Sequence, residues 1–166
     1  MKELKPMRKS TGFTLIELVI VLVILGILAA VALPRYVSLQ ADARGAKINA
    51  VLGAMKSAAA ISHAAALARS LPSTATTLSM EGVNITLLNQ YPTADAAGII
   101  SASQIVAADG FTISAGGAGA GQLITIQALG AAVPATCQVS YTSPTGVNTS
   151  PVFSVPLTAA IILANC

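Results

Sequence analysis

The chain has 166 residues, of which 54% are apolar and only 9% are charged, whereas soluble domains carry about 25% charged residues. The whole formal net charge of +3 comes from the first twelve residues, which hold four bases and one acid. No Lys or Arg follows Arg69, so residues 72–166 are acidic. This distribution excludes a nucleic-acid binder that acts through a basic patch.

The most apolar segment runs from Phe13 to Leu33, and Glu17 is its only ionisable residue. As an α-helix, these 21 residues would span about 31 Å, the thickness of a membrane's hydrocarbon core. The preceding bases predict that the N-terminus stays in the cytoplasm and that the C-terminus lies outside. A plain anchor is the simplest interpretation, because a signal peptide has a shorter apolar run and a small-residue cleavage site.

Glu17 does not fit a plain anchor, because a carboxylate inside an apolar helix is costly unless it has a partner. No base lies within the helix, and Arg35 is 18 residues further on, about 27 Å along the helix axis. A charge partner would therefore have to come from residues 1–12, from lipid headgroups or from another copy of the chain.

Residues 9–18 read KSTGFTLIEL, and this motif before a long apolar run resembles the signature of type IV pilins and of the related type II secretion pseudopilins. The resemblance implies that a membrane aspartic peptidase cuts between Gly12 and Phe13 and methylates the new amino group of Phe13. Glu17 then becomes an assembly residue. We expect its carboxylate to pair with the Phe13 amine of a neighbouring subunit, because the amine of its own chain lies four residues away on the same helix.

The pattern and the resemblance together divide the chain into four parts. These are a cleaved leader (1–12), a transmembrane and assembly helix (13–34), an amphipathic stem helix (35–71) and a globular head (72–166). Gly26 and Pro34 weaken a helix, and the resemblance favours a kink or local melting there. The alternative is that Pro34 marks the end of the membrane span.

The stem carries apolar residues at spacings of three, four and seven, which predicts one face packed on the head. These residues are Ile48, Val51, Leu52, Met55, Ala59 and Ala66. The polar residues Arg44, Lys47, Asn49 and Lys56 fall mainly on other faces. The basic stem and the acidic head could attract each other across subunits; ordinary solvated faces are the alternative.

Alternating apolar and polar residues in the C-terminal part predict an antiparallel sheet of about four strands. The candidate strands are 111–114, 123–127, 137–141 and 152–155. We interpret 116–121 as a flexible, glycine-rich hairpin loop and 143–146 as a turn. Before the sheet, 83–88 is a candidate extended piece and 94–107 a candidate short helix. The expected fold class is α+β, a long N-terminal helix packed against a small antiparallel sheet, as in pilins.

Cys137 and Cys166 are the only cysteines. An even number beyond a membrane segment favours a disulfide in an oxidising compartment, with two buried thiols as the alternative. The resemblance also implies a C-terminal disulfide loop.

His63 has no Cys, Asp or Glu at ligand spacing, so we expect a surface or packing residue. We expect no metal, no cofactor and no enzymatic activity, since neither paired carboxylates nor a metal cluster is evident.

Residues 34–56 and 88–99 are similar to pilins of the mannose-sensitive haemagglutinin type. The resemblance implies a structural, and major, subunit of a type IV pilus of a Gram-negative bacterium, used in adhesion or motility. Its partners would be copies of itself in a helical filament, the prepilin peptidase and an inner-membrane assembly platform driven by an ATPase. The protein would be stored in the inner membrane and then exported to the cell surface.

Three alternatives remain open at this point. A type II secretion pseudopilin shares the N-terminal pattern, but major pseudopilins carry an acidic calcium-binding loop and usually lack the cysteine pair. A minor pilin also fits. The third alternative is a non-polymerising anchored binding domain, which would keep its N-terminus near Met1.

Overall fold

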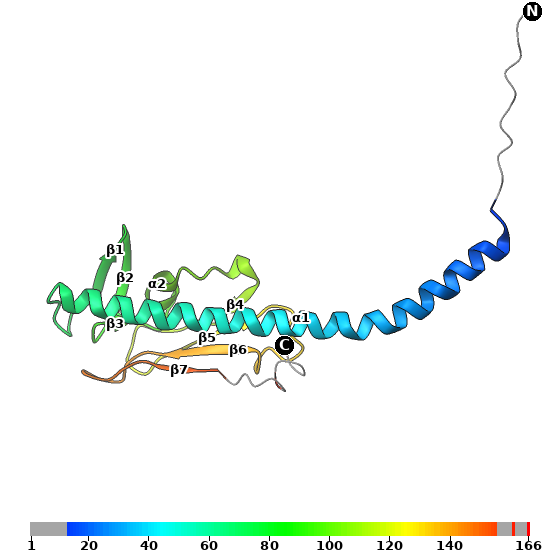
Figure 1. Ribbon diagram of the computed structural model, residues 1–166. Coiled ribbons are helices and arrows are strands. Elements are labelled where there is room, and N and C mark those ends of the chain that lie inside the picture. The colour runs from blue at the N-terminus through cyan, green and yellow to red at the C-terminus, as the bar shows by residue number, and fades with distance from the viewer. Residues whose placement is uncertain (1–12, 156–160, 162–165) are drawn as a thin grey trace, which may run out of the picture. The chain divides into compact units, whose positions relative to one another are not determined.

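The computed structural model describes residues 13–155, 161 and 166. The expected leader, with Gly12, lies outside these residues. The chain divides into two units, Met1–Val37 and Ser38–Cys166. One uninterrupted helix, α1 (Leu15–Ala68), begins in the first unit and ends in the second, and Pro34 lies inside it (Figure 1). The stem expected from residue 35 onward thus continues the apolar helix through Pro34.

The N-terminal part of α1 makes no core. Every side chain from Phe13 to Tyr36 is exposed in the isolated chain, and the large ones are almost all Leu, Ile and Val. Among the described residues, α1 is the one helix long and apolar enough to cross a membrane. A helix that is apolar on all faces requires lipid or other protein around it.

The C-terminal end of α1 is closed by its own backbone. The Ser70 amide donates to the Leu67 carbonyl, and the Leu71 amide donates to the Ala66 carbonyl, both at 2.9 Å. Ser70 has a positive φ of 51°. This pair of bonds is a Schellman motif, which satisfies the last free carbonyls of a helix. The helix thus ends at Ala68, three residues before the expected end.

The expected four-stranded sheet is confirmed. Consecutive antiparallel strands pair in the order β4 (Phe111–Ile113), β5 (Leu123–Ala128), β6 (Gln138–Thr142) and β7 (Val152–Ser154). Alternate residues of β5 and β6 are buried, among them Ile124, Ile126, Val139 and Tyr141. Figure 1 shows this sheet beside the part of α1 that belongs to the second unit.

A second sheet was not predicted from the sequence. It contains β1 (Thr77–Met80), β2 (Val83–Leu88) and β3 (Tyr91–Pro92) in antiparallel order. Only β2 matches an expected extended piece. Two-residue loops connect the strands, and their residues, Glu81-Gly82 and Asn89-Gln90, all have positive φ. Such backbone angles fit the twist of a tight hairpin, but neither loop has the Asn-Gly or Asp-Gly sequence that usually indicates one.

The helix expected over 94–107 is wrong as a single element. The structure has a π-helical turn at Ala96–Ile100, a short helix α2 at Ser101–Ser103 and a 3₁₀ turn at Ala107–Asp109. The backbone of Gly98 leaves helical geometry, and Gln104 adopts a left-handed conformation with φ of 55°. The Asp95 carboxylate accepts the Gly98 amide at 2.7 Å and the Thr93 hydroxyl at 2.8 Å, so it fixes the first break.

The core joins the apolar face of α1 to the sheet, as the stem pattern predicts. Ile48, Met55 and Ala59 are at most 2% exposed and belong to one cluster with residues of β5 and β6. The Tyr141 hydroxyl, inside this cluster, donates to the Pro92 carbonyl at 2.5 Å. Burial, with a smaller effect of Tyr91, raises the pKa of the Tyr141 phenol. The phenol therefore stays protonated and remains a donor.

The glycine-rich loop is not simply a flexible connection. The Gly117 amide donates to the Ala94 carbonyl at 2.9 Å, and the backbone of Gly116 passes so close to Ala94 that a methyl group on Gly116 would overlap the Ala94 carbonyl. The absence of a side chain at Gly116 permits this approach. In contrast, a methyl group on Gly119 would meet the nearest Gln122 carbon at an ordinary 3.5 Å.

We predict that Gly116→Ala destabilises the folded chain by about 1–3 kcal/mol, because the new methyl group displaces backbone rather than a movable side chain. Gly119→Ala, in the same loop, should change stability by less than about 0.5 kcal/mol. Denaturant unfolding of the full chain in detergent micelles, followed by circular dichroism, measures both. Equal stability of the two variants would contradict the close packing at Gly116.

Candidate functional site

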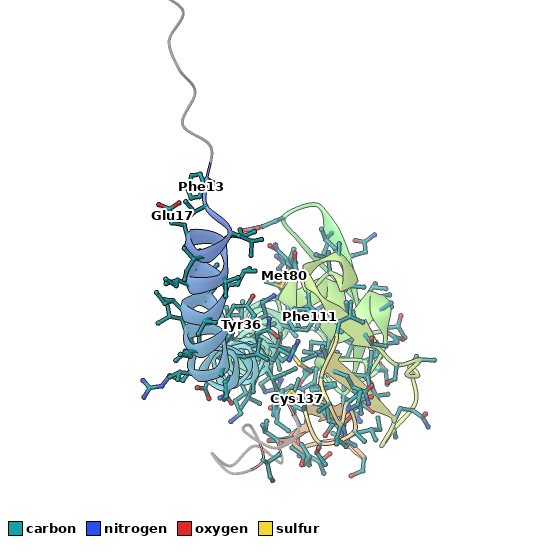
Figure 2. The ribbon with its side chains drawn as sticks, turned by 90° about the vertical axis from the view of Figure 1, so that its right-hand side faces the viewer. Phe13, Glu17, Tyr36, Met80, Phe111 and Cys137 are labelled. Atoms are coloured by element: carbon teal, nitrogen blue, oxygen red, sulfur yellow. A yellow bond between two sulfur atoms is a disulfide. The ribbon has the colours of Figure 1, made fainter. Side chains whose placement is uncertain are left out.

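The described chain begins with a compact hydrogen-bonded group around Glu17. The Glu17 carboxylate accepts the Thr14 backbone amide at 2.9 Å and the Thr14 hydroxyl at 2.7 Å. The Thr14 hydroxyl oxygen in turn accepts the Glu17 amide at 3.3 Å. Figure 2 shows Glu17 and Phe13 together at the start of the helix. This reciprocal arrangement is a capping box, which satisfies free amides in the first turn of a helix.

Thr14, which caps the first turn of α1, was not predicted from the sequence. The sequence does contain the indication, since Thr14 and Glu17 have the Thr-x-x-Glu spacing of a capping box. The expected partner of Glu17 was a charged group, whereas the structure supplies neutral donors from the same chain. A carboxylate at the positive end of the helix dipole is also favoured electrostatically. Glu17 is thus compatible with an apolar helix before any second molecule arrives.

The Glu17 carboxylate folds back to the Thr14 amide, which belongs to the residue directly after Phe13. Phe13 itself is 88% exposed. The expected pairing of Glu17 with the Phe13 amine of a neighbouring subunit stays a prediction.

Gly26 and Pro34, the expected kink positions, both lie inside α1. A side chain at Gly26 would have no atom of another residue within 4 Å, so packing within the chain does not require glycine there. The kink or local melting at these two residues stays a prediction.

Three bases of α1 bind backbone carbonyls of the second unit. Arg44 donates to the Cys166 carbonyl at 2.8 Å, and Arg69 donates to the Ser79 carbonyl at 2.5 Å. Lys47 donates more weakly to the Asp109 carbonyl at 3.3 Å. The expectation that Arg44 lies on a face away from the head is wrong, because it is only partly exposed and is held against the C-terminal segment. The hydrogen bonds of these three bases therefore stabilise the fold within a single chain.

The two cysteines are joined, as expected. The disulfide connects Cys137 to Cys166 over a separation of 29 residues, and the two side chains are 0% and 3% exposed. Cys137 directly precedes β6, so the bond ties Cys166 to the sheet. The Arg44 hydrogen bond to the Cys166 carbonyl adds a second attachment of the same residue, to helix α1.

His63 is a packing residue, as expected. Its ring stacks on Tyr91 with centroids 4.0 Å apart and planes 5° from parallel. The His63 Nδ1 atom lies 3.3 Å from the Gln90 carbonyl, which it can reach as a donor. Within the residues that the structure describes, no group of three His, Cys, Asp or Glu side chains is placed to hold a metal ion.

Comparison with known proteins adds three findings. Residues 7–33 match the family model described as the prokaryotic N-terminal methylation motif. The Thermus thermophilus protein named "Type IV narrow pilus major component PilA5" is 38% identical over 109 residues, which cover 66% of this chain and 90% of that protein. No solved structure matches the chain.

Two further relatives match over shorter stretches. "Fimbrial protein EcpB" of Eikenella corrodens is 52% identical over 52 residues, or 31% of this chain and 33% of its own. A "Fimbrial protein" of Pseudomonas aeruginosa is 45% identical over 53 residues, or 32% of this chain and 34% of its own. These two matches therefore concern about a third of each protein.

We predict that loss of the disulfide lowers the free energy of unfolding by about 3–4 kcal/mol, because the unfolded chain regains the freedom of a loop of roughly 30 residues. The test is denaturant unfolding of Cys137→Ala/Cys166→Ala in micelles, compared with wild-type protein reduced by dithiothreitol. Both should lose stability by similar amounts. An unchanged unfolding midpoint in both samples would show that the bond contributes nothing.

We further predict that Thr14→Val loosens the first turn of α1, because valine keeps the shape of threonine but removes the hydroxyl that caps the helix. Amide hydrogen exchange of residues 15–18 in micelles should accelerate roughly fivefold. Thr14→Ser, which keeps the hydroxyl, is the matched control. If the valine and serine variants exchange at the same rate, the hydroxyl has no capping role.

Proposed function

We propose, since this chain belongs to the type IV pilin family, that it is the major structural subunit of an extracellular pilus used in adhesion or motility. The observation that carries the proposal is the exposed apolar helix that begins at Leu15, inside the matched methylation motif of residues 7–33. Such a surface is unstable in water and needs lipid first and other subunits later. The Thermus relative, named a major component of a narrow pilus, supports the major over the minor role.

Processing is the first step of the proposed cycle. The prepilin peptidase cuts between Gly12 and Phe13 and methylates the Phe13 amine. The match to the methylation motif over residues 7–33 supports this step. The boundary also fits the helix, since Phe13 lies just outside the capping box that begins with Thr14. The resulting parts are a leader (1–12), an assembly helix (13–34), a stem (35–71) and a head (72–166).

Assembly is the second step, in which Glu17 and the new amine neutralise each other in the apolar interior of the filament. Thr14 already holds the carboxylate in the first turn. The ammonium partner is the Phe13 amine of a neighbouring subunit, and this pairing leaves no uncompensated charge inside the filament. Copies of the chain then form a homopolymer through residues 13–34.

The location of the protein changes along this cycle. The uncut and cut subunits are stored in the inner membrane, where the apolar helix lies in the hydrocarbon layer. An inner-membrane assembly platform, driven by an ATPase, extracts them into the growing filament at the cell surface. Two features favour a pilus over a type II pseudopilus, namely the disulfide and the lack of Asp or Glu after Asp109. Relatives named as fimbrial proteins support a structural role rather than an enzymatic one.

We predict that filament protein sheared from cells begins with methylated Phe13, as measured by mass spectrometry of its N-terminal peptide.

Glu17→Gln keeps a hydrogen-bonding group beside Thr14 but removes the charge. This variant should be cut normally, stay in the membrane and yield several-fold fewer filaments. Asp42→Asn, which removes an exposed carboxylate from the same helix, is the matched control and should assemble normally.

Two results would contradict the proposal. Surface protein that retains residues 1–12 would exclude the cleavage step. Normal filament yield from Glu17→Gln would exclude the role of the carboxylate in assembly.

A further inference from the structure

A cavity lies between the C-terminal part of α1, the β1–β2 hairpin and α2. Its volume is about 250 Å³. Its apolar wall includes Ile61, Met80 and Val83, and Ile61 and Val83 are about half exposed. In Figure 1 the hairpin stands out beside α1, and Figure 2 marks Met80 on it. All of these residues belong to the second unit of the chain.

Ser62 points to an occupant that is missing from the isolated chain. It lines the cavity from α1 and is only 1% exposed, and its hydroxyl makes none of the hydrogen bonds found among the described residues. No fully inaccessible side-chain oxygen or nitrogen in the described chain lacks a partner. The small remaining exposure of Ser62 is therefore at its hydroxyl. A buried hydroxyl that is open to a cavity is expected to bind something polar there.

The negative charge of Glu81 favours a positively charged occupant of the cavity. Glu81 lies in the two-residue loop of the hairpin, is exposed, and lines the same cavity. Its φ of 50° and the φ of 82° at Gly82 are those of a tight turn, so the backbone that carries Glu81 has a defined conformation. Arg69, the base nearest to Glu81 in the sequence, donates to the Ser79 carbonyl, and residues 72–166 contain no further Lys or Arg. A carboxylate, a hydroxyl and an apolar wall together suit a lysine, whose methylenes pack on apolar side chains while its ammonium binds oxygen atoms.

The lysines of α1 in the same chain do not fill this cavity. Lys47 lines a different cavity and binds the Asp109 carbonyl. Lys56 lines a third one, where its Nζ atom lies 6.0 Å from the centre of the Phe153 ring. Lys56 is exposed and makes none of the hydrogen bonds found among the described residues, so it is the base that a contact between molecules can recruit at the lowest cost.

We propose that the cavity at Glu81 and Ser62 receives Lys56 from a second copy of this chain. The contact is heterologous, because it joins the hairpin of one molecule to the stem helix of another. A heterologous contact whose rotation does not close into a ring repeats from subunit to subunit and generates a filament. The inference rests on the proposed pilus function, because only a polymer offers a second stem helix at every position. An exposed ion pair is weak by itself, but the filament repeats it at every subunit.

Zero-length crosslinking tests the contact directly. A carbodiimide joins a carboxylate to an amine only where the two groups touch, and mass spectrometry identifies the linked peptides. Sheared wild-type filaments should give a Glu81–Lys56 link that is absent from detergent-solubilised monomers. Glu81→Gln should lose this link, whereas Asp109→Asn, which removes another exposed carboxylate of the head, should keep it. The same link in monomers, or a link from Glu81 to Lys47 or to a different protein, would overturn the assignment.

Charge reversal provides a second test in cells. Glu81→Lys and Lys56→Glu should each reduce surface filaments several-fold, and the double variant should restore them. Circular dichroism of each purified variant in micelles checks that the head still folds. Normal filaments from both single variants would overturn the contact while leaving the pilus function intact. If wild-type cells made no filaments of this chain, the proposed function itself would fail instead.

Discussion

The central constraint on this protein is a helix surface that the chain itself cannot cover. From Phe13 to Tyr36 all described side chains are exposed, and apolar surface of this size is costly in water. The N-terminal half of α1 therefore needs an environment of lipid or protein, and the hydrogen-bonded pair of Thr14 and Glu17 lets one carboxylate enter it. The second unit, Ser38–Cys166, instead buries a core of its own, which the C-terminal part of α1 and the sheet build together.

Most of the fold could be predicted because its elements follow regular periods. The apolar face of α1 and the alternating strands of the four-stranded sheet repeat every three to four and every two residues, and burial enforces both patterns. The second sheet could not be predicted, because its tight loops depend on positive φ at Glu81, Asn89 and Gln90, residues that seldom indicate a hairpin. The helix over 94–107 fails because Asp95 and Gly98 interrupt it through local hydrogen bonds.

In the candidate site, too, some residues could be predicted from the sequence and others could not. Gly12, Phe13 and Glu17 stand out in the sequence because a lone acid in an apolar segment is rare and the surrounding motif is specific, and their roles stay predictions. Thr14 was not predicted, because a charged partner was expected for Glu17, although a neutral cap at the start of the helix also satisfies a carboxylate. The role of Arg44 was missed as well, because the carbonyl that it binds belongs to Cys166, which is 122 positions away in the sequence and close only after folding.

The bases of the stem have a mechanical consequence. Arg44 and Arg69 bind the rest of the second unit at two points that lie 25 residues apart, or about 38 Å along α1. If a filament is pulled, tension carried by the helices reaches each head as shear along this length. Because the head is attached near both ends of that segment, it cannot peel away from one end, and a rupture would have to break both attachments together with the core between them.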